Sequence, residues 1–257
     1  MKIFLTLLLA ALFCSAALFS ENAAFASTPG ENARTAQGRR PESGIVEGFY
    51  GRPWTEAERR MMLHFLGEHG MNLYVYAPKD DPYHREKWRE PYPPQEMLAL
   101  KRLAAEARTA GVELVFAVSP GLDQRFSGWA GEADEKAMLR KLESVHAMGV
   151  ERFAIFFDDI ERKDGRAQAL FVNRLNEELL TRRLTEKPLL VVPTEYFLQD
   201  MKTAGVAKSY TREFAAQLDD DIVVLFTGEG VVPEGISAED MAEAERLYGR
   251  PLGVWWN

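Results

Sequence analysis

The stretch FAIFFDDIE, residues 153–161, sets five apolar residues directly before two adjacent aspartates. A continuous apolar run of this length is typical of a strand that is buried on both faces, as strands of a parallel sheet are. Two carboxylates at the end of such a strand are costly to take out of water, because like charges repel each other. The pair is therefore either an ordinary solvated turn or a functional site, and the rest of the chain has to distinguish the two.

Short apolar runs alternate with longer helical patterns from residue 44 onward. We predict strands at 45–50, 72–77, 112–118, 152–157, 189–192, 222–226 and 252–255. We predict helices at 56–68, 95–109, 134–148, 166–184, 211–218 and 238–248. Thr55 with Glu58, and Ser237 with Asp240, are typical of helix starts, and glycines mark several of the helix ends.

Buried strands that are joined by helices predict an α/β fold with a parallel sheet. A (β/α)8 TIM barrel is favoured because polar residues follow each predicted strand, and the carboxyl ends of the strands form the active-site face of such a barrel. A doubly wound sheet is the alternative. Seven predicted strands leave out an eighth, so we expect a barrel over residues 44–257 that is incomplete at its C-terminal end.

The N-terminal segment, residues 1–26, has one lysine, a long apolar run and a small-residue site ending at Ala26. This pattern predicts a cleaved signal peptide and a secreted or periplasmic protein, whereas a membrane anchor is the weaker alternative. Cys14, the only cysteine, falls in this segment, so the mature chain has no thiol for a disulfide or a metal site. Residues 27–43 are polar and predict a disordered leader.

Composition and motifs exclude several classes of function. The net charge of −8 argues against a nucleic-acid or anionic-membrane partner, which would require a basic patch. The chain has no glycine-rich dinucleotide or phosphate loop after a strand, no HExxH and no GxSxG. The four histidines are scattered along the sequence. We therefore expect neither a metal site nor a cofactor.

The side chains that follow the strands are carboxylates, hydroxyls, an amide and aromatic rings, a set that suits a sugar. Two close carboxylates are what glycoside hydrolysis needs. Successive strand residues point to opposite faces, so one of Asp158 and Asp159 is expected to face the barrel axis and the other the rim. Such a pair suggests that the substrate's own 2-acetamido oxygen attacks the anomeric carbon, while one aspartate orients the acetamido N–H and the other transfers protons.

Seven motifs carry a family resemblance. They are GIVEGFYGRPWT (44–55), MNLYVYAPKDDPYHREKWREPYP (71–93), FAVSPGLD (116–123), FAIFFDDI (153–160), VPTEY (192–196), FTG (226–228) and VWWN (254–257). The chain resembles glycoside hydrolase family 84, the β-N-acetylglucosaminidases that include O-GlcNAcase and bacterial relatives called hyaluronidases. The resemblance implies a (β/α)8 barrel and retaining, substrate-assisted removal of terminal β-linked N-acetylglucosamine from glycans or glycoproteins.

By motif position, the resemblance also implies roles for eight residues. Asp158 is implied to steer the acetamido group and stabilise the oxazoline, and Asp159 to act as general acid and then general base. Tyr196 is implied to hydrogen-bond near the reacting acetamido oxygen. The resemblance assigns substrate binding to Gly48, Lys79, Thr227, Trp255 and Asn257, with Thr227 and Trp255 as walls of an acetyl pocket.

The chain also departs from the family pattern. Trp256 stands where relatives commonly have aspartate, and Phe226 replaces a tryptophan. Two further sugar-binding residues are expected at positions past Asn257. Two alternatives therefore stay open: a truncated, inactive remnant or sugar-binding fragment of such an enzyme, and a chitinase-like or hexosaminidase-like enzyme, which usually pairs a glutamate with the aspartate.

Overall fold

The structure is a computed structural model that describes residues 41–257. The predicted signal peptide and residues 27–40 of the predicted leader lie outside the described residues. Within residues 41–257, none of the helices has both the length and the apolar character that crossing a membrane requires.

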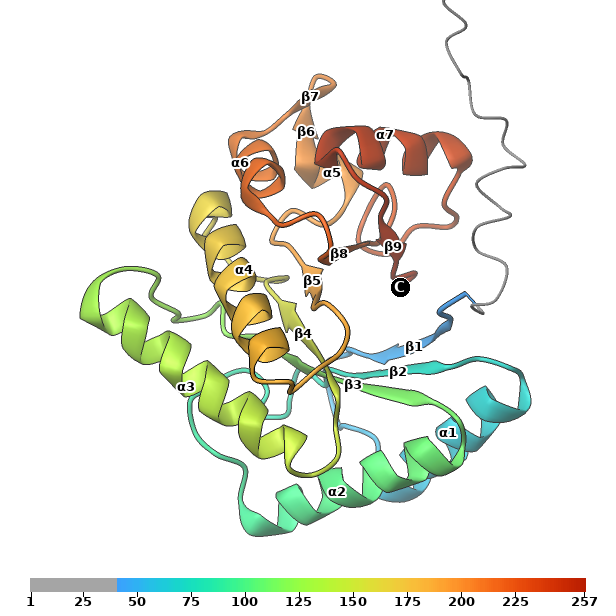
Figure 1. Ribbon diagram of the computed structural model, residues 1–257. Coiled ribbons are helices and arrows are strands. Elements are labelled where there is room, and N and C mark those ends of the chain that lie inside the picture. The colour runs from blue at the N-terminus through green and yellow to red at the C-terminus, as the bar shows by residue number, and fades with distance from the viewer. Residues whose placement is uncertain (1–40) are drawn as a thin grey trace, which may run out of the picture. The chain divides into compact units, whose positions relative to one another are not determined.

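Seven strands form one curled sheet (Figure 1). They are β1 (Gly44–Glu47), β2 (Leu73–Tyr76), β3 (Glu113–Val118), β4 (Arg152–Phe156), β5 (Leu190–Val192), β8 (Val223–Phe226) and β9 (Gly253–Val254). Every neighbouring pair is parallel, and the strands lie side by side in chain order. A doubly wound sheet reverses its strand order at a switch point, and this sheet does not. The predicted α/β fold, an incomplete (β/α)8 barrel with seven strands, is confirmed.

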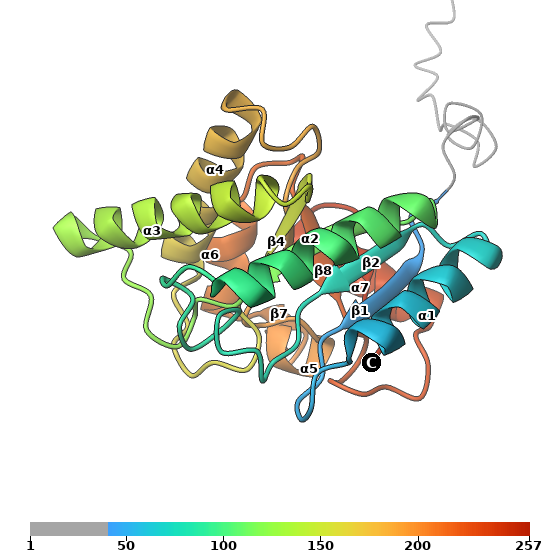
Figure 2. The ribbon, with the colours of Figure 1, turned by 90° about the horizontal axis from the view of Figure 1, so that it is seen from below.

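Helices follow the strands and cover the outer face of the sheet (Figures 1 and 2). They are α1 (Glu56–Glu68), α2 (Pro94–Thr109), α3 (Gly128–His146), α4 (Gly165–Thr181), α6 (Ser209–Gln217) and α7 (Ala238–Tyr248). The predicted bounds of α1 and α7 are confirmed, and both helices begin with the predicted capping box. The prediction for α3 was wrong at its start, because the helix begins at Gly128 rather than at residue 134. Its first turn carries Trp129, which is 81% exposed, and so shows no apolar stripe.

A small excursion follows β5 that the sequence did not predict. It contains α5 (Leu198–Met201) and the antiparallel hairpin of β6 (Lys202–Thr203) and β7 (Val206–Ala207). The two turn residues, Ala204 and Gly205, have φ angles of 50° and 77°. Such positive φ angles are typical of two-residue hairpin turns. In a sequence, these hairpins are usually recognised by Asn-Gly or Asp-Gly between two strands in which apolar and polar residues alternate. Strands of two residues are too short to show that alternation.

Burial on both faces explains the continuous apolar run in β4. Phe153, Ile155 and Phe157 pack with helix residues in the outer core, between the sheet and the helices. Ala154 and Phe156 belong to a second cluster on the inner face of the curl. The inner cluster comprises Val75, Ala77, Val115, Ala117, Ala154, Phe156, Leu190, Val192, Tyr196, Leu225 and Trp255. The register between β3 and β4 pairs Ala117 with Ala154, which puts two small side chains next to each other on the inner face.

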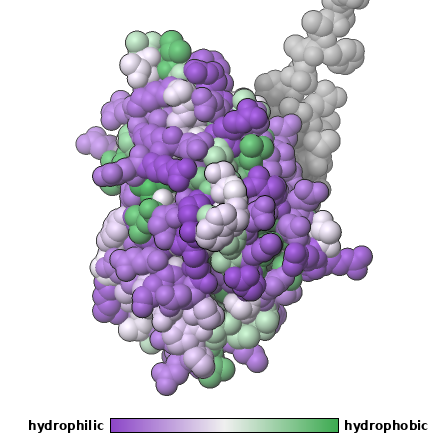
Figure 3. Space-filling model, turned by 90° about the vertical axis from the view of Figure 1, so that its left-hand side faces the viewer, coloured by the Kyte–Doolittle hydropathy of each residue, from purple (hydrophilic) through white to green (hydrophobic). Residues whose placement is uncertain are grey.

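The face of the molecule that carries α3 and α4 is mostly polar (Figure 3). It lies on the left in Figure 1, and its hydrophobic patches are small and separate. Each of these helices therefore turns its apolar stripe to the outer core and its charged residues to solvent.

Candidate active site

Two of the predicted site residues continue the series of side chains that point to the inner face of the sheet. Ala77 belongs to the inner cluster, and Lys79 follows two positions later. Phe156 belongs to the same cluster, and Asp158 follows two positions later. Since strand residues that are two apart share a face, both side chains are aimed inward at the carboxyl ends of β2 and β4.

Asp158 and Lys79 meet as a buried ion pair. Lys79 Nζ lies 2.5 Å from Asp158 Oδ2, and the two side chains are 1% and 3% exposed. Lys79 Nζ also lies 5.8 Å from the centre of the Phe156 ring. Asp158 Oδ1 is buried and has no hydrogen-bond partner within residues 41–257. The site thus contains a buried carboxylate with one oxygen held by a cation and the other oxygen open as an acceptor.

Asp159 is exposed, whereas its neighbour Asp158 is buried. Its φ of 56° is in the left-handed region, which is uncommon outside glycine but tolerated by aspartate. Tyr50 donates a hydrogen bond of 2.8 Å to Asp159 Oδ2, and Tyr196 donates one of 3.2 Å to Oδ1. Arg85 Nη2 donates to the Asp159 carbonyl oxygen at 3.0 Å. Three side chains therefore fix both the turn and the carboxylate.

The two phenols that hold Asp159 stay protonated near neutral pH. Burial, followed by the hydrogen bond to Asp159, raises the pKa of Tyr50. Burial, followed by the charges of Asp159 and Asp158, raises the pKa of Tyr196. Both hydroxyls are thus donors to the carboxylate, and Arg85 Nη1 in turn donates to the Tyr50 hydroxyl at 2.8 Å. Neither Tyr50 nor Arg85 was predicted to have a role, although both lie within motifs of the family.

A neutral histidine supports the loop that carries Lys79 and Arg85. Burial, followed by the charge of Lys79, lowers the pKa of His84 to about 3. Its Nδ1 lies 2.7 Å from the Ala117 carbonyl oxygen, so Nδ1 carries the proton and donates. Nε2 is then the acceptor for the Ser119 hydroxyl at 3.0 Å. The ring joins the loop after β2 to the end of β3.

Gly48 and Trp255 are in close contact at the ends of β1 and β9. A Cβ atom on Gly48 would lie 2.8 Å from the Trp255 indole, so only glycine fits there without a shift of the ring. The Trp255 ring centre is 5.4 Å from that of Phe156, the last residue of β4 and two positions before Asp158. Trp255 therefore forms part of the wall beside the aspartates.

Thr227 is fully buried and joined to Tyr196. Its backbone N–H donates to the Tyr196 carbonyl oxygen at 3.1 Å, and its hydroxyl donates to the Gly230 carbonyl oxygen at 3.0 Å. Asn257 is exposed and forms no hydrogen bond with any other residue in the described part of the chain. Its binding role stays a prediction. Residues 41–257 contain no cluster of three or more His, Cys, Asp or Glu side chains that could hold a metal ion.

Comparison with known proteins agrees with this geometry. A family model described as beta-N-acetylglucosaminidase matches residues 43–257. The protein O-GlcNAcases of Rattus norvegicus and Mus musculus are each 34% identical over 226 residues, which is 85% of this chain and 24% of theirs. The chain thus spans about a quarter of the length of these curated relatives.

Two solved structures are similar in fold and sequence. CpGH84B superposes with a TM-score of 0.82 at 48% identity, over 84% of this chain and 39% of that one. A mutant of the Thermobaculum terrenum O-GlcNAc hydrolase gives a TM-score of 0.77 at 33% identity, over 84% of this chain and 47% of that one. The family resemblance drawn from the motifs is confirmed. The chain belongs to the β-N-acetylglucosaminidase family, glycoside hydrolase family 84.

Proposed function

We propose that the protein is an exported β-N-acetylglucosaminidase that removes terminal β-linked N-acetylglucosamine from glycans or glycoproteins. Family membership supports the sugar and the reaction class, and the names of the rat and mouse relatives point to glycosylated proteins as one kind of substrate. Export rests on the signal peptide predicted at residues 1–26.

The reaction proposed is hydrolysis with retention, assisted by the substrate. The acetamido oxygen attacks the anomeric carbon and forms an oxazoline, while Asp159 gives its proton to the departing glycosidic oxygen. Water then attacks the anomeric carbon and breaks its bond to the oxazoline oxygen, which restores the acetamido group, while Asp159 takes a proton from that water. The exposed position of Asp159 suits this exchange with leaving group and solvent.

The open oxygen of Asp158 is the observation that carries this mechanism. Oδ1 is buried without a partner among the described residues, so an acetamido N–H that reached it would satisfy an acceptor that is costly to leave unpaired. The positive charge that develops on the acetamido nitrogen would then face a buried carboxylate. Lys79 holds the other oxygen, which makes Asp158 better suited to orienting a substrate than to attacking it.

The test is hydrolysis of aryl β-N-acetylglucosaminides whose phenols differ in acidity, with wild type and Asp159→Asn. For the poorest leaving group, the variant should lose about 10²–10⁴-fold in kcat/KM, the usual contribution of a general acid. For a phenol that leaves without protonation, the loss should be far smaller.

Asp164→Asn is the matched control, because Asp164 caps the start of α4 and asparagine caps equally well. This control should behave as wild type on every substrate. An equal loss across the whole series for Asp159→Asn, or no loss at all, would remove Asp159 from the acid role.

A further inference from the structure

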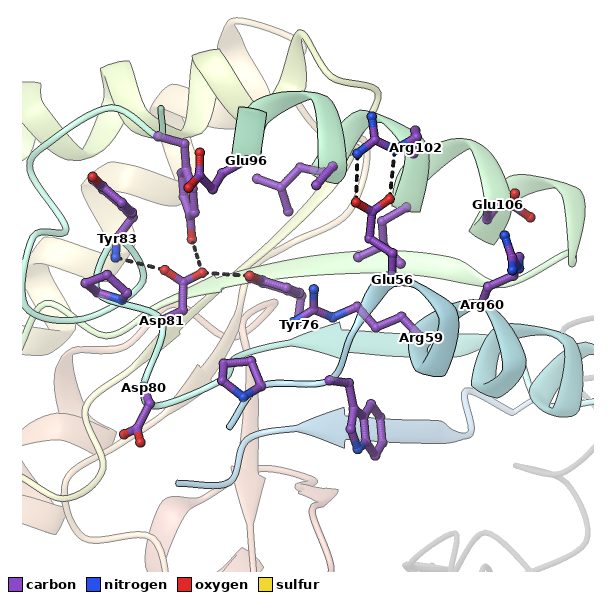
Figure 4. Close-up of a pocket in the computed structure, with 17 residues that line it drawn as sticks. Glu56, Arg59, Arg60, Tyr76, Asp80, Asp81, Tyr83, Glu96, Arg102 and Glu106 are labelled. Atoms are coloured by element: carbon purple, nitrogen blue, oxygen red, sulfur yellow. Dashed lines mark hydrogen bonds and ion pairs between the residues drawn. The ribbon is translucent and has the colours of Figure 1, made fainter. Parts of the chain in front are cut away.

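A cavity of about 320 Å³ lies on the outer side of the sheet, between α1, α2 and the loop after β2 (Figure 4). None of the predicted site residues lines it. We call it the α1–α2 pocket, and it is lined by Trp54, Arg59, Tyr76, Asp80, Tyr83 and Glu96, among others. Its volume is in the range of sites for small molecules.

The inner end of the α1–α2 pocket is a fixed, polar structure. The carboxylate of Asp81, which is 8% exposed, accepts hydrogen bonds from the hydroxyls of Tyr76 at 2.6 Å and Tyr92 at 2.8 Å. It also accepts from the Tyr83 backbone N–H at 2.9 Å (Figure 4). Because these groups satisfy one another, the pocket is preorganised rather than collapsible.

The charges of the lining argue against an anionic ligand. Five carboxylates line the α1–α2 pocket against three guanidinium groups, and Arg102 is already engaged by Glu56 through two bonds of 2.7 Å. Arg59 is engaged by Glu47 at 2.8 Å. A phosphate or carboxylate would therefore meet an excess of negative charge.

The aromatic faces argue against a cationic ligand. The Arg59 guanidinium lies 4.8 Å from the centre of the Tyr76 ring. Lys141 Nζ lies 4.5 Å from the centre of the Tyr92 ring and 5.6 Å from that of Tyr83. The three tyrosine rings of the lining thus already have a cation, so a cationic ligand would gain little from them.

Open polar groups of both kinds remain around the α1–α2 pocket. Glu96, Glu106 and Arg60 form no side-chain hydrogen bond or salt bridge with any residue in 41–257, so both acceptors and donors are available. Sugar hydroxyls both donate and accept, and the apolar face of a sugar ring can lie against an indole such as that of Trp54. We propose that the α1–α2 pocket is a second binding site, for a neutral, hydroxyl-rich ligand of one or two sugar rings.

This second site shares a wall with the catalytic one. Asp80 Oδ2 accepts a hydrogen bond of 2.9 Å from the Gly51 backbone N–H. Asp80 follows Lys79, the partner of Asp158, and Gly51 follows Tyr50, the donor to Asp159. The pocket therefore lies directly behind the two loops that hold the aspartates, where another unit of a glycan substrate could be bound. Binding there requires no catalysis, so the inference goes beyond the proposed function and stands independently of it.

The test follows two indole N–H signals by NMR while cellobiose or lactose is added to the purified protein. Both are neutral disaccharides without an acetamido group, which the catalytic site is proposed to require. The Trp54 signal, assigned from Trp54→Phe, should shift and saturate, and the Trp255 signal should not move. Ala99→Phe fills the pocket and should abolish the shift, whereas Ala105→Phe, on the exposed side of the same helix, should preserve it.

Three results would overturn the inference. One is a Trp54 signal that neither disaccharide shifts at about 50 mM, where a ligand with a millimolar Kd would be bound. Another is a shift of Trp54 with inorganic phosphate or lysine amide in place of the sugars. The last is a sugar-induced shift that survives in Ala99→Phe. A protein that binds cellobiose at Trp54 but hydrolyses no N-acetylglucosaminide would contradict the proposed function and leave this inference intact.

Discussion

The buried ion pair between Lys79 and Asp158 gives a stability prediction that is strong enough to test the geometry. Lys79→Met keeps the length of the side chain but removes the only cation in contact with the Asp158 carboxylate among the described residues. Both side chains are 3% exposed or less, so water cannot replace the lost partner. Breaking a buried pair on one side costs about 3–5 kcal/mol, and we expect Lys79→Met to lose that much unfolding free energy.

A double-mutant cycle measures the interaction energy of Lys79 with Asp158 separately from the packing of the two side chains. Asp158→Asn alone should also destabilise strongly, because it leaves the Lys79 ammonium buried without its counter-charge. The double variant Lys79→Met/Asp158→Asn should lie within about 1–2 kcal/mol of wild type, since replacing both charges removes the uncompensated one. The coupling energy from the cycle should then exceed about 3 kcal/mol in magnitude.

The assay is urea unfolding at neutral pH, followed by tryptophan fluorescence and circular dichroism. Lys101→Met is the control, because Lys101 is exposed on α2, and it should change the unfolding free energy by less than about 0.5 kcal/mol. A loss of less than about 1 kcal/mol for Lys79→Met, the range of a surface pair, would refute the buried ion pair.

Three further predictions concern the groups around the pair. Tyr50→Phe removes a hydrogen-bond donor to Asp159 and should lower kcat/KM for a substrate with a poor leaving group about tenfold. Unchanged kinetics would contradict a role of Tyr50 in positioning Asp159. Because the pKa of His84 is about 3 in the fold and about 6.5 when unfolded, the unfolded chain protonates first as the pH falls. The urea-unfolding free energy should therefore decrease between about pH 6.5 and pH 3, by up to ~1.4 kcal/mol per unit, and less steeply in His84→Gln; equal slopes would contradict this. In Gly48→Ala the added methyl group would displace the Trp255 ring, so KM for the aryl substrate should rise. An unchanged KM would contradict the close contact between Gly48 and Trp255.

Much of the fold could be predicted because a strand that is buried on both faces has a continuous apolar sequence. In β4 every residue is apolar apart from Arg152, and alternate residues of the run face the helices and the inner cluster. The same period of two continues past the strand to Asp158, which is why the inward aspartate could be expected from the sequence. Capping residues fixed the starts of α1 and α7 for a local reason that requires no tertiary contact.

The parts that could not be predicted depend on contacts between distant segments. Tyr50 and Arg85 reach Asp159 across 109 and 74 residues, and no local pattern indicates which hydroxyl or guanidinium will reach a given carboxylate. The left-handed turn at Asp159 occurs at a residue other than glycine, so composition does not mark it. The α1–α2 pocket arises from how two helices and one loop pack, and its lining residues are ordinary helix-surface residues in the sequence.

The most direct test of the proposed mechanism is the dependence of hydrolysis on the substrate's acetyl group. Aryl β-N-acetylglucosaminide and the matching aryl 2-amino-2-deoxyglucoside would be incubated with the purified protein, with circular dichroism of the same sample as the folding check. We predict release of phenol from the acetylated substrate and none from the free amine, because only the former carries the attacking oxygen. Equal release from both would contradict substrate assistance, and a folded protein that releases phenol from neither would contradict the proposed activity.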